Sequence, residues 1–297
     1  MKIAFIGLGA MGGPMAAALA NAGHDVTGFD FSDDALTRLE AAGGSRAASA
    51  RSACDGADAL VLMVVNAMQA QSVLVDDGGL DALPEGALVL SSVTMPPDEA
   101  ERIGADVTAT GRHFLDAPVS GGAVGAQNAA LTFMASGSEA AFAAARPLME
   151  AMGEHVFECG DAPGAGSTMK MVHQLAAGCN LAVAAEVMSF GTHLGLDPRR
   201  VLDVLNVSAG GSWMIGNRGP RMLTEGREAT SAVDIFVKDL GIVLDSARRN
   251  RFPVPVSAAA LQVFLGASGA GFGSHDDSQT TRFYEAMGGK RVRREDG

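Results

Sequence analysis

The first thirty residues constrain the fold more than any other stretch of this 297-residue chain. A short β-rich run at 2–6 leads into a glycine-rich turn, and an alanine-rich helical stretch at 13–22 follows. A second strand pattern at 25–29 then ends at Asp30. A glycine turn between a strand and a helix, with an acid after the next strand, is the full context of a dinucleotide-binding β-α-β unit. The sequence therefore predicts an α/β Rossmann domain with a mostly parallel, doubly wound sheet.

The glycines of the turn have separate physical roles in such a unit. Gly7 permits the tight turn, Gly9 lets the backbone approach a pyrophosphate, and Gly12 allows close packing of helix on strand. The N-terminus of the helix offers its N–H groups and its dipole to the phosphates. We predict cofactor contacts along the whole turn: Gly7, Leu8, Gly9, Ala10, Met11 and Gly12.

Asp30 indicates which nicotinamide cofactor is bound. It lies 23 residues after Gly7, where an acid binds the hydroxyls of the adenosine ribose. A carboxylate there repels a 2′-phosphate, and no arginine follows it directly. The sequence therefore favours NAD over NADP.

Further residues follow the later strand patterns, because the carboxyl ends of parallel strands line the ligand crevice. Strands are predicted at 59–65, 87–90 and 113–119, with the last strands at 131–135 and 155–157 on either side of a helix at 138–152. Ser92 either contacts a ligand or caps the next helix. The predicted cofactor contacts here are Val65, Asn66, Val93 and Thr94.

Ser120-Gly121-Gly122 follows the strand pattern at 113–119. Two glycines after a serine free the backbone to present N–H groups to an anion. An ordinary glycine-rich loop is the alternative, and we favour an anion site.

After Asp161 the strand signals stop, and one long helix is predicted from about Gly164 to Leu194. Its length would be roughly 45 Å at about 1.5 Å per residue, too long for a crossover within an α/β sheet. We therefore expect it to join two domains: a Rossmann domain at 1–162 and an all-α domain at 163–290, followed by a solvated tail at 291–297. The apolar residues that predict one buried stripe on this helix are 169, 172, 176, 179, 183, 187, 190 and 194.

The rest of the second half is also expected to be helical. Helices are predicted at 199–205, 231–249, 256–265 and 279–287. The stretches 208–217, which holds the single tryptophan Trp213, and 269–277 are predicted to be loops.

The composition restricts the classes of partner that the protein can be expected to bind. A formal net charge of −12 argues against nucleic acid and anionic membrane surfaces. The three cysteines have neither metal nor redox spacing, and their odd number suits a reducing compartment. We see no signal peptide, no apolar run long enough to span a bilayer and no cluster of metal ligands, so we expect a cytoplasmic protein without a metal.

Four sequence blocks resemble the β-hydroxyacid dehydrogenase family, which contains 3-hydroxyisobutyrate dehydrogenase and tartronate semialdehyde reductase. They are GLGAMGGPM from Gly7, DAPVSGG from Asp116, GAGSTMK from Gly164 and KDL from Lys238, and they follow the family's order. The resemblance implies a long helix between a Rossmann domain and a helical domain, and a homodimer or homotetramer. It implies that Lys170 is the catalytic acid/base, that Ser120, Gly121 and Gly122 hold the substrate carboxylate, and that Lys238 lies near the nicotinamide half of NAD.

Three residues depart from the family pattern, at two places in the chain. His173 and Gln174 stand where many members carry asparagines, which alters the substrate wall. Val93 replaces a threonine, which leaves only its backbone for a cofactor contact. The segments KMVHQLAAG, SWMIGNR and SAVDIFVKDLG are most similar to the L-threonate dehydrogenase branch.

The expected substrate is a small anionic hydroxy acid. His173, Gln174, Ser212, Trp213, Asn217 and Arg218 offer hydrogen-bonding groups that suit a polyhydroxy acid such as L-threonate, although several of them could instead stabilise the helical domain. Burial among Met169, Met171 and Ala177 would lower the pKa of Lys170 towards neutrality, so that it could take the hydroxyl proton during hydride transfer. A solvated surface charge is the alternative for Lys170. The alternatives in function are 3-hydroxyisobutyrate oxidation, a tartronate or succinic semialdehyde-type reductase and, more distantly, a non-catalytic dinucleotide-binding protein.

Overall fold

The computed structural model describes residues 1–224 and 229–293. The chain packs into two compact units, Met1–Lys170 and Met171–Gly297, each described by itself below. The boundary between them falls after residue 170, inside the long helix, whereas the sequence placed a domain boundary at 162. Residues 294–297 of the predicted tail lie outside the described residues.

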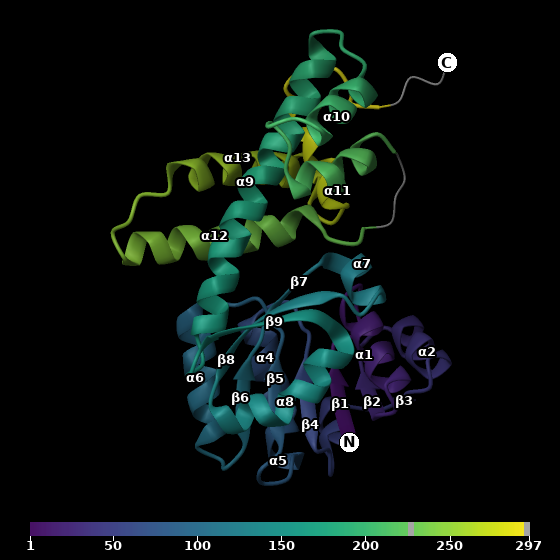
Figure 1. The fold of residues 1–297 in the computed structure, drawn as a ribbon, viewed down its shortest axis with the longest axis vertical. Coiled ribbons are helices and arrows are strands. Elements are labelled where there is room, and N and C mark those ends of the chain that lie inside the picture. The colour runs from purple at the N-terminus through teal and green to yellow at the C-terminus, as the bar shows by residue number, and fades with distance from the viewer. Residues whose placement is uncertain (225–228, 294–297) are drawn as a thin grey trace. The chain divides into compact units, whose positions relative to one another are not determined.

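A single sheet organises the first unit (Figure 1). In the described residues its strand order is β3-β2-β1-β4-β5-β6-β8-β7, and β9 pairs with β8. The pairs from β3 to β6 are parallel, while β8 runs antiparallel to β6 and β7. The strands are β1 (Lys2–Ile6), β2 (Asp25–Phe29), β3 (Ser45–Arg46), β4 (Ala59–Leu62), β5 (Leu88–Ser91), β6 (His113–Asp116), β7 (Val119–Ser120), β8 (Leu131–Gly137) and β9 (Gly153–Gly160).

The predicted Rossmann architecture is confirmed, although β3 was not predicted and β9 is longer than the predicted 155–157. Two of the predicted strands also differ. The strand predicted at 59–65 ends at Leu62, and the one predicted at 113–119 divides into β6 and β7. The second difference arises because β6 pairs with β5 on one side, whereas β7 pairs only with β8.

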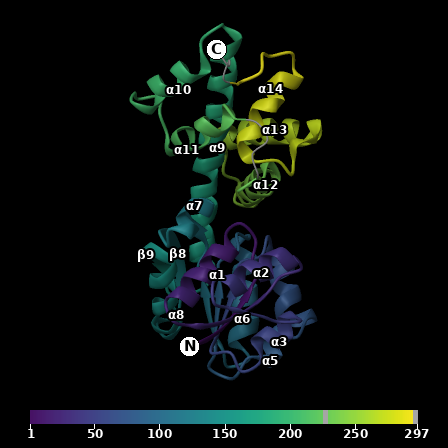
Figure 2. The same cartoon turned by 90° about the vertical axis from the view of Figure 1, so that its right-hand side faces the viewer.

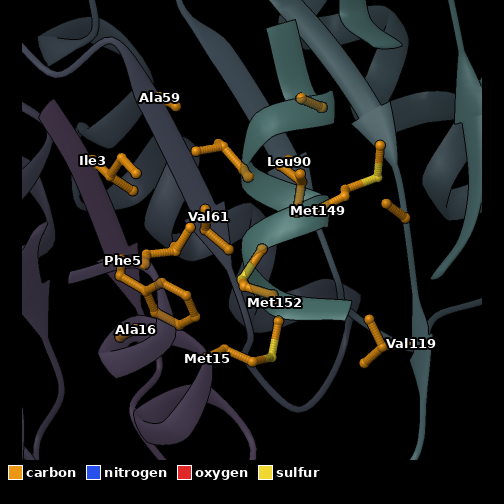
Figure 3. Packing of buried hydrophobic residues seen from close by; sticks show 14 of the residues in the cluster. Ile3, Phe5, Met15, Ala16, Ala59, Val61, Leu90, Val119, Met149 and Met152 are labelled. Carbon is orange, nitrogen blue, oxygen red and sulfur yellow. The ribbon is translucent and has the colours of Figure 1, made fainter. Parts of the chain in front are cut away.

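Helices cover both faces of this sheet because alternate residues of its strands point to opposite sides. On β1, Ile3 and Phe5 pack with Met15 of α1 and with α8, as Figure 3 shows, whereas Ala4 and Ile6 belong to a second core with Ile103 of α6. The helices of this unit are α1 (Gly12–Asn21), α2 (Asp33–Ala41), α3 (Ala50–Cys54), α4 (Ala67–Gln71), the π-helix η1 (Ser72–Asp76), α5 (Gly79–Ala82), α6 (Pro97–Thr108), α7 (Gly122–Gln127) and α8 (Glu139–Met152).

Helix α9 (Ala165–His193) begins in the first unit and continues through the second, whose core forms around it (Figure 2). Phe236 of α12 stacks on Phe264 of α13 at 5.0 Å between ring centroids. The remaining helices are α10 (Pro198–Asn206), α11 (Trp213–Met222), α12 (Val233–Arg249), α13 (Pro255–Ala267), the π-helix η2 (Ser268–Phe272), the 3-10 helix η3 (Asp277–Thr281) and α14 (Arg282–Ala286).

The predictions of two loops in the second half were each wrong in part. The predicted loop 208–217 contains the start of α11, because Ser212 caps that helix by accepting a hydrogen bond from Ile215 N at 3.2 Å. The predicted loop 269–277 overlaps η2, and its two final aspartates are buried. Asp277 accepts from Arg218 Nε at 2.7 Å, and Arg221 lies 3.2 Å from Asp276. These two ion pairs hold α11 against η3.

The prediction of a buried stripe on α9 is wrong. Val172, Val183 and Phe190 of this stripe are 56%, 52% and 62% exposed. The covered side of α9 carries Lys170, Gln174 and Gly178 together with leucine, alanine and methionine further along. We refer to the eight residues 169, 172, 176, 179, 183, 187, 190 and 194 as the α9 stripe.

The expectation that no apolar run is long enough to cross a bilayer is also wrong. By length and composition alone, two helices are long and apolar enough to do so: Ala165–His193 and Pro255–Phe272. Such helices are weak evidence for a membrane span, because core helices of soluble proteins pass the same test, and half of the apolar window in α9 is buried.

Candidate active site

The turn between β1 and α1 has the geometry of a phosphate-binding turn. Gly7 has a φ of +93°, and its N–H donates to Phe29 O at 3.1 Å, which ties the turn to the end of β2. A Cβ on Gly12 would lie 1.8 Å from Gly7 O, so the helix packs directly on the turn. A Cβ on Gly9 would meet no heavy atom within 4 Å in the described structure. The glycines therefore fit the separate roles that the sequence predicts for them.

The N-terminus of α1 fits an anionic ligand. Of the described side chains, none caps this helix, and its first turn carries no acid. Helices α2, α3, α4 and α8 each have a side-chain cap. Because the first N–H groups of a helix need partners and its dipole favours negative charge, this end can hold the pyrophosphate of NAD.

Asp30 is held at the rim of this turn. Its carboxylate accepts from Leu8 N at 2.7 Å and from Ser32 N at 2.8 Å. The first bond joins the end of β2 to the glycine turn, which places the carboxylate beside that turn.

The other predicted cofactor residues follow β4 and β5. Asn66 caps α4 by accepting from Gln69 N at 2.9 Å, and Val65 beside it is half-exposed. The Val93 side chain is fully buried in the core, which agrees with a backbone-only contact at this position, and Thr94 is partly buried. The Ser92 hydroxyl is buried and has no hydrogen-bond partner in the described structure, so it does not cap the next helix.

The predicted anion loop lies between β7 and α7. Ser120 ends β7, and Gly121 and Gly122 adopt φ values of +130° and +63°. Residues other than glycine rarely adopt such backbone angles. The loop therefore has the backbone freedom that an anion-binding site needs.

Lys170 lies on the first part of α9 and is 7% exposed, so it is not a solvated surface charge. The prediction that Lys170 is buried among apolar side chains is wrong for Met169, which is 48% exposed. Asp116, at the end of β6, accepts hydrogen bonds from Gly164 N at 3.0 Å and from Ser167 N at 2.8 Å, which anchors the start of this helix.

Within the second unit, four polar residues form a connected chain. Lys238 Nζ lies 2.7 Å from Asp239 Oδ1, and the Gln174 amide donates to Asp239 Oδ2. The Gln174 oxygen lies 3.0 Å from His173 Nδ1. Because a carboxylate paired with lysine only accepts, the Gln174 amide nitrogen faces it, and His173 Nδ1 must donate to the amide oxygen. In the neutral ring Nε2 is then an acceptor.

The other polar groups expected to recognise substrate are largely used by the fold. Ser212 caps α11, and Arg218 pairs with Asp277 while bonding Asn217. Trp213 is 62% exposed, with the Arg218 guanidinium carbon 6.0 Å from its ring centroid.

Asp116 and Asp239 are polar residues at these sites to which the sequence analysis gave no role. Both lie in the blocks that carry the family resemblance. Asp239 also follows Phe236 by three residues on the buried side of α12, where a charged residue is rare without a function or a partner. An acid on the buried side of a helix was therefore the signal by which the sequence could have identified Asp239.

Two family profiles match the chain. The NAD-binding domain of 6-phosphogluconate dehydrogenase matches residues 2–160, and the NAD-binding domain of NADP-dependent 3-hydroxyisobutyrate dehydrogenase matches residues 164–284. L-threonate dehydrogenase of Cupriavidus necator is 44% identical over 96% of this chain and 97% of its own length.

Solved structures agree with these matches. The 3-hydroxyisobutyrate dehydrogenase of Salmonella typhimurium is 43% identical with a TM-score of 0.90, covering 94% of this chain and 98% of that one. Psf3, solved in complex with NADP⁺ and 2-OPP, is 27% identical with a TM-score of 0.86, covering 95% of this chain and 99% of that one.

An NAD(P)-binding Rossmann unit followed by a helical unit, with these relatives, defines an NAD(P)-dependent oxidoreductase. The chain belongs to the β-hydroxyacid dehydrogenase family, which includes the 3-hydroxyisobutyrate and L-threonate dehydrogenases.

Proposed function

We propose that the protein oxidises L-threonate to its keto acid with NAD⁺ and that Lys170 is the general base. The observation that carries the catalytic part is the burial of Lys170, one of four lysines in the chain, near the start of α9. A buried amine loses its proton more readily than an exposed one, which suits proton abstraction near neutral pH.

Each predicted residue has a defined task in this proposal. The glycine turn and the N-terminus of α1 hold the pyrophosphate, and Asp30 holds the adenosine ribose. Ser120 and the amides of Gly121 and Gly122 hold the substrate carboxylate. Lys170 takes the hydroxyl proton, and its ammonium form can return it in the reverse direction. Bound NAD⁺ supplies the hydride acceptor.

We propose that residues 1–162 form the NAD-binding domain, which also holds the substrate carboxylate through residues 120–122, and that residues 163–290 form the substrate and oligomerisation domain. The family profiles, which meet between residues 160 and 164, support the position of this boundary.

The choice of L-threonate rests on His173 and Gln174. Their hydrogen-bonded chain to Asp239 places an imidazole and an amide side by side, and such polar groups suit the hydroxyls of a polyhydroxy acid. The name of the Cupriavidus necator relative supports this choice. The name of the Salmonella typhimurium relative, at nearly equal identity, keeps 3-hydroxyisobutyrate as the second candidate.

A substrate panel tests the proposal. Initial rates are measured with L-threonate, 3-hydroxyisobutyrate and glycerate, and in the reverse direction with tartronate and succinic semialdehydes, each with both cofactors. We expect kcat/KM for L-threonate with NAD⁺ to exceed that for 3-hydroxyisobutyrate on the order of 100-fold, because a polar site rejects an analogue that leaves it unpaired. A higher value for 3-hydroxyisobutyrate would establish the second candidate, and no turnover of any compound would favour a non-catalytic binding protein.

The preference for NAD is tested by Asp30→Asn. Like charges near a protein surface repel by about 1–4 kcal/mol at contact distances, so we expect kcat/KM with NADP⁺ to rise about tenfold relative to NAD⁺. The asparagine oxygen can still accept from Leu8 N, which preserves the turn. Asp34→Asn, on the adjacent exposed helix, is the matched control and should leave the ratio unchanged. An unchanged ratio in Asp30→Asn would show that Asp30 does not select the cofactor.

We further propose that a second copy of the chain covers the α9 stripe in a homodimer or homotetramer. The exposed apolar row along one helix supports this, since such patches on a folded protein mark contact sites. We expect Phe190→Glu to shift the mass measured by light scattering towards that of a monomer. Arg248→Glu, an exposed charge reversal on α12, should leave the mass unchanged. An oligomer unaffected by Phe190→Glu would place the interface elsewhere.

A cytoplasmic location, with neither nucleic acid nor membrane as a partner, completes the proposal. The net charge of −12 and three free cysteines support it.

A further inference from the structure

The start of α9 rests on a row of buried polar side chains at the ends of three strands. Ser91 of β5 is the register partner of Asp116 of β6, and Asp116 is the register partner of Ser136 of β8. All three are fully buried. Register partners in a sheet point to the same face, so this row lines one side of the sheet.

Asp116 and Ser136 satisfy the first N–H groups of α9. Gly164 N and Ser167 N donate to Asp116 Oδ2 at 3.0 and 2.8 Å, and Ser167 Oγ donates to Oδ1 at 2.8 Å. Gly166 N donates to Ser136 Oγ at 2.9 Å. The first N–H groups of a helix have no partners within the helix, so a distant strand supplies the cap here. The carboxylate also lies at the positive end of the helix dipole.

The backbone of Gly166 packs so closely on the sheet that the first turn of α9 cannot move towards it. A Cβ on Gly166 would lie 2.5 Å from Met134 O and 2.6 Å from Asp116 O. The first turn of α9 therefore lies directly against β6 and β8, and its position is set by contact as well as by hydrogen bonds.

These contacts reach Lys170 through one helical turn. Ser167 and Lys170 are three residues apart, so they share one side of α9, and they are 1% and 7% exposed. A shift of the Asp116 contacts moves Ser167 and, with it, the base of the Lys170 side chain.

We propose that Asp116 is a positioning residue that fixes the Lys170 amine for proton transfer by holding the first turn of α9. This inference rests on the proposed role of Lys170. Burial raises the pKa of Asp116, and the hydrogen bonds from Ser167, Gly164 and Ser136 oppose that rise. An isolated buried carboxylate is costly, and here several donors on one helix end offset the cost.

The central test is Asp116→Asn. Its amide oxygen can keep the two N–H bonds that Oδ2 accepts, but its amide nitrogen then replaces the Oδ1 acceptor of the Ser167 hydroxyl, and the negative charge at the positive end of the helix dipole is lost. Because misplacing a reacting group by about 1 Å can cost on the order of 100-fold in rate, we expect kcat to fall about 10- to 100-fold. The dissociation constant for NAD⁺, measured by calorimetry, should stay within about twofold because the glycine turn is untouched. Ser167→Ala removes only the hydroxyl contact and keeps both N–H bonds, so its loss of kcat should be smaller.

A matched control separates positioning from stability. Ser49→Ala removes the Ser49 Oγ acceptor of Ser52 N, a 3.1 Å cap on α3 in the same unit. It should lower the melting temperature and leave kcat unchanged. If Asp116→Asn and Ser167→Ala also lower only the melting temperature, the inference is overturned and Asp116 is a structural cap.

Amine labelling gives a readout that needs no turnover. The chain has four lysines, so Lys2, Lys238 and Lys290 serve as internal references for the labelling rate of Lys170, followed by peptide mass spectrometry. We expect Asp116→Asn, or Ser167→Ala should the former not fold, to change the Lys170 rate several-fold and leave the references unchanged. An unchanged Lys170 rate counts against the inference. Normal turnover of Lys170→Ala would instead contradict the proposed role of Lys170 as the base. The labelling rates would still show whether Asp116 positions the Lys170 side chain.

Discussion

Lys170→Ala is expected to lower kcat by about 10²–10⁴-fold, the usual contribution of a general acid or base. The alanine keeps α9 helical and removes the amine with the side chain beyond Cβ, while the glycine turn is untouched, so NAD⁺ should bind with its affinity unchanged. Steady-state rates with the preferred hydroxy acid, together with calorimetric titration of NAD⁺, measure both quantities.

Lys290→Ala serves as the matched control, because it removes an exposed lysine of the second unit. Its rates should equal those of the wild type. Near-normal turnover of Lys170→Ala would rule out Lys170 as the base, and equal losses in both variants would indicate a general charge effect.

Two alanine substitutions in one turn are expected to fail in different ways. In Gly12→Ala, the new Cβ overlaps Gly7 O, since it would lie only 1.8 Å away. Relief requires the helix to move from the strand, so we expect a loss of about 1–3 kcal/mol in the free energy of unfolding. In Gly9→Ala, the new Cβ has no neighbour within 4 Å and the fold should keep its stability.

The Gly9→Ala methyl group would instead occupy the approach of the pyrophosphate. We expect its affinity for NAD⁺ to fall at least about tenfold, or 1.4 kcal/mol. Thermal unfolding and NAD⁺ titration of both variants provide the comparison. Tight NAD⁺ binding by Gly9→Ala would mean that the backbone of this turn does not approach the phosphates.

The sequence predicted the Rossmann unit well because its signals are local. The short apolar run of β1, the glycine turn and Asp30 lie within thirty residues, and the same residues hold one another in the structure through Gly7 and Leu8. The helical second unit was also predicted, since its apolar residues repeat at helical spacing.

The face of α9 could not be predicted from its period. A spacing of three and four shows which residues share a side, but both sides of α9 are largely apolar, so the pattern does not show which one the chain covers. The covered side carries Lys170, Gln174 and Gly178, which weakens its apolar signal. Leu240 fills the space over Gly178, where a Cβ would lie 2.8 Å from its Cδ2. Small and polar residues can thus mark a closely packed face.

The partners of the candidate catalytic and substrate residues were missed because they are far away in the sequence. Asp116 bonds Ser167 across 51 residues, and Asp239 accepts from Gln174 across 65 residues. One sequence shows that both acids stand in motifs, but their contacts depend on how the sheet and helices pack. The polar residues around Trp213 were assigned to substrate for the same reason, although Arg218 pairs with Asp277, 59 residues further on.

The border between the two compact units inside α9 has a consequence for recombination between related genes. Lys170 closes the first unit, and His173 and Gln174 open the second, within about one helical turn. A crossover at Met171 would join the cofactor turn and lysine of one parent to the His173–Gln174 segment of another without interrupting either hydrogen-bonded cluster. Chimeras built at this position would exchange the proposed specificity residues as one block.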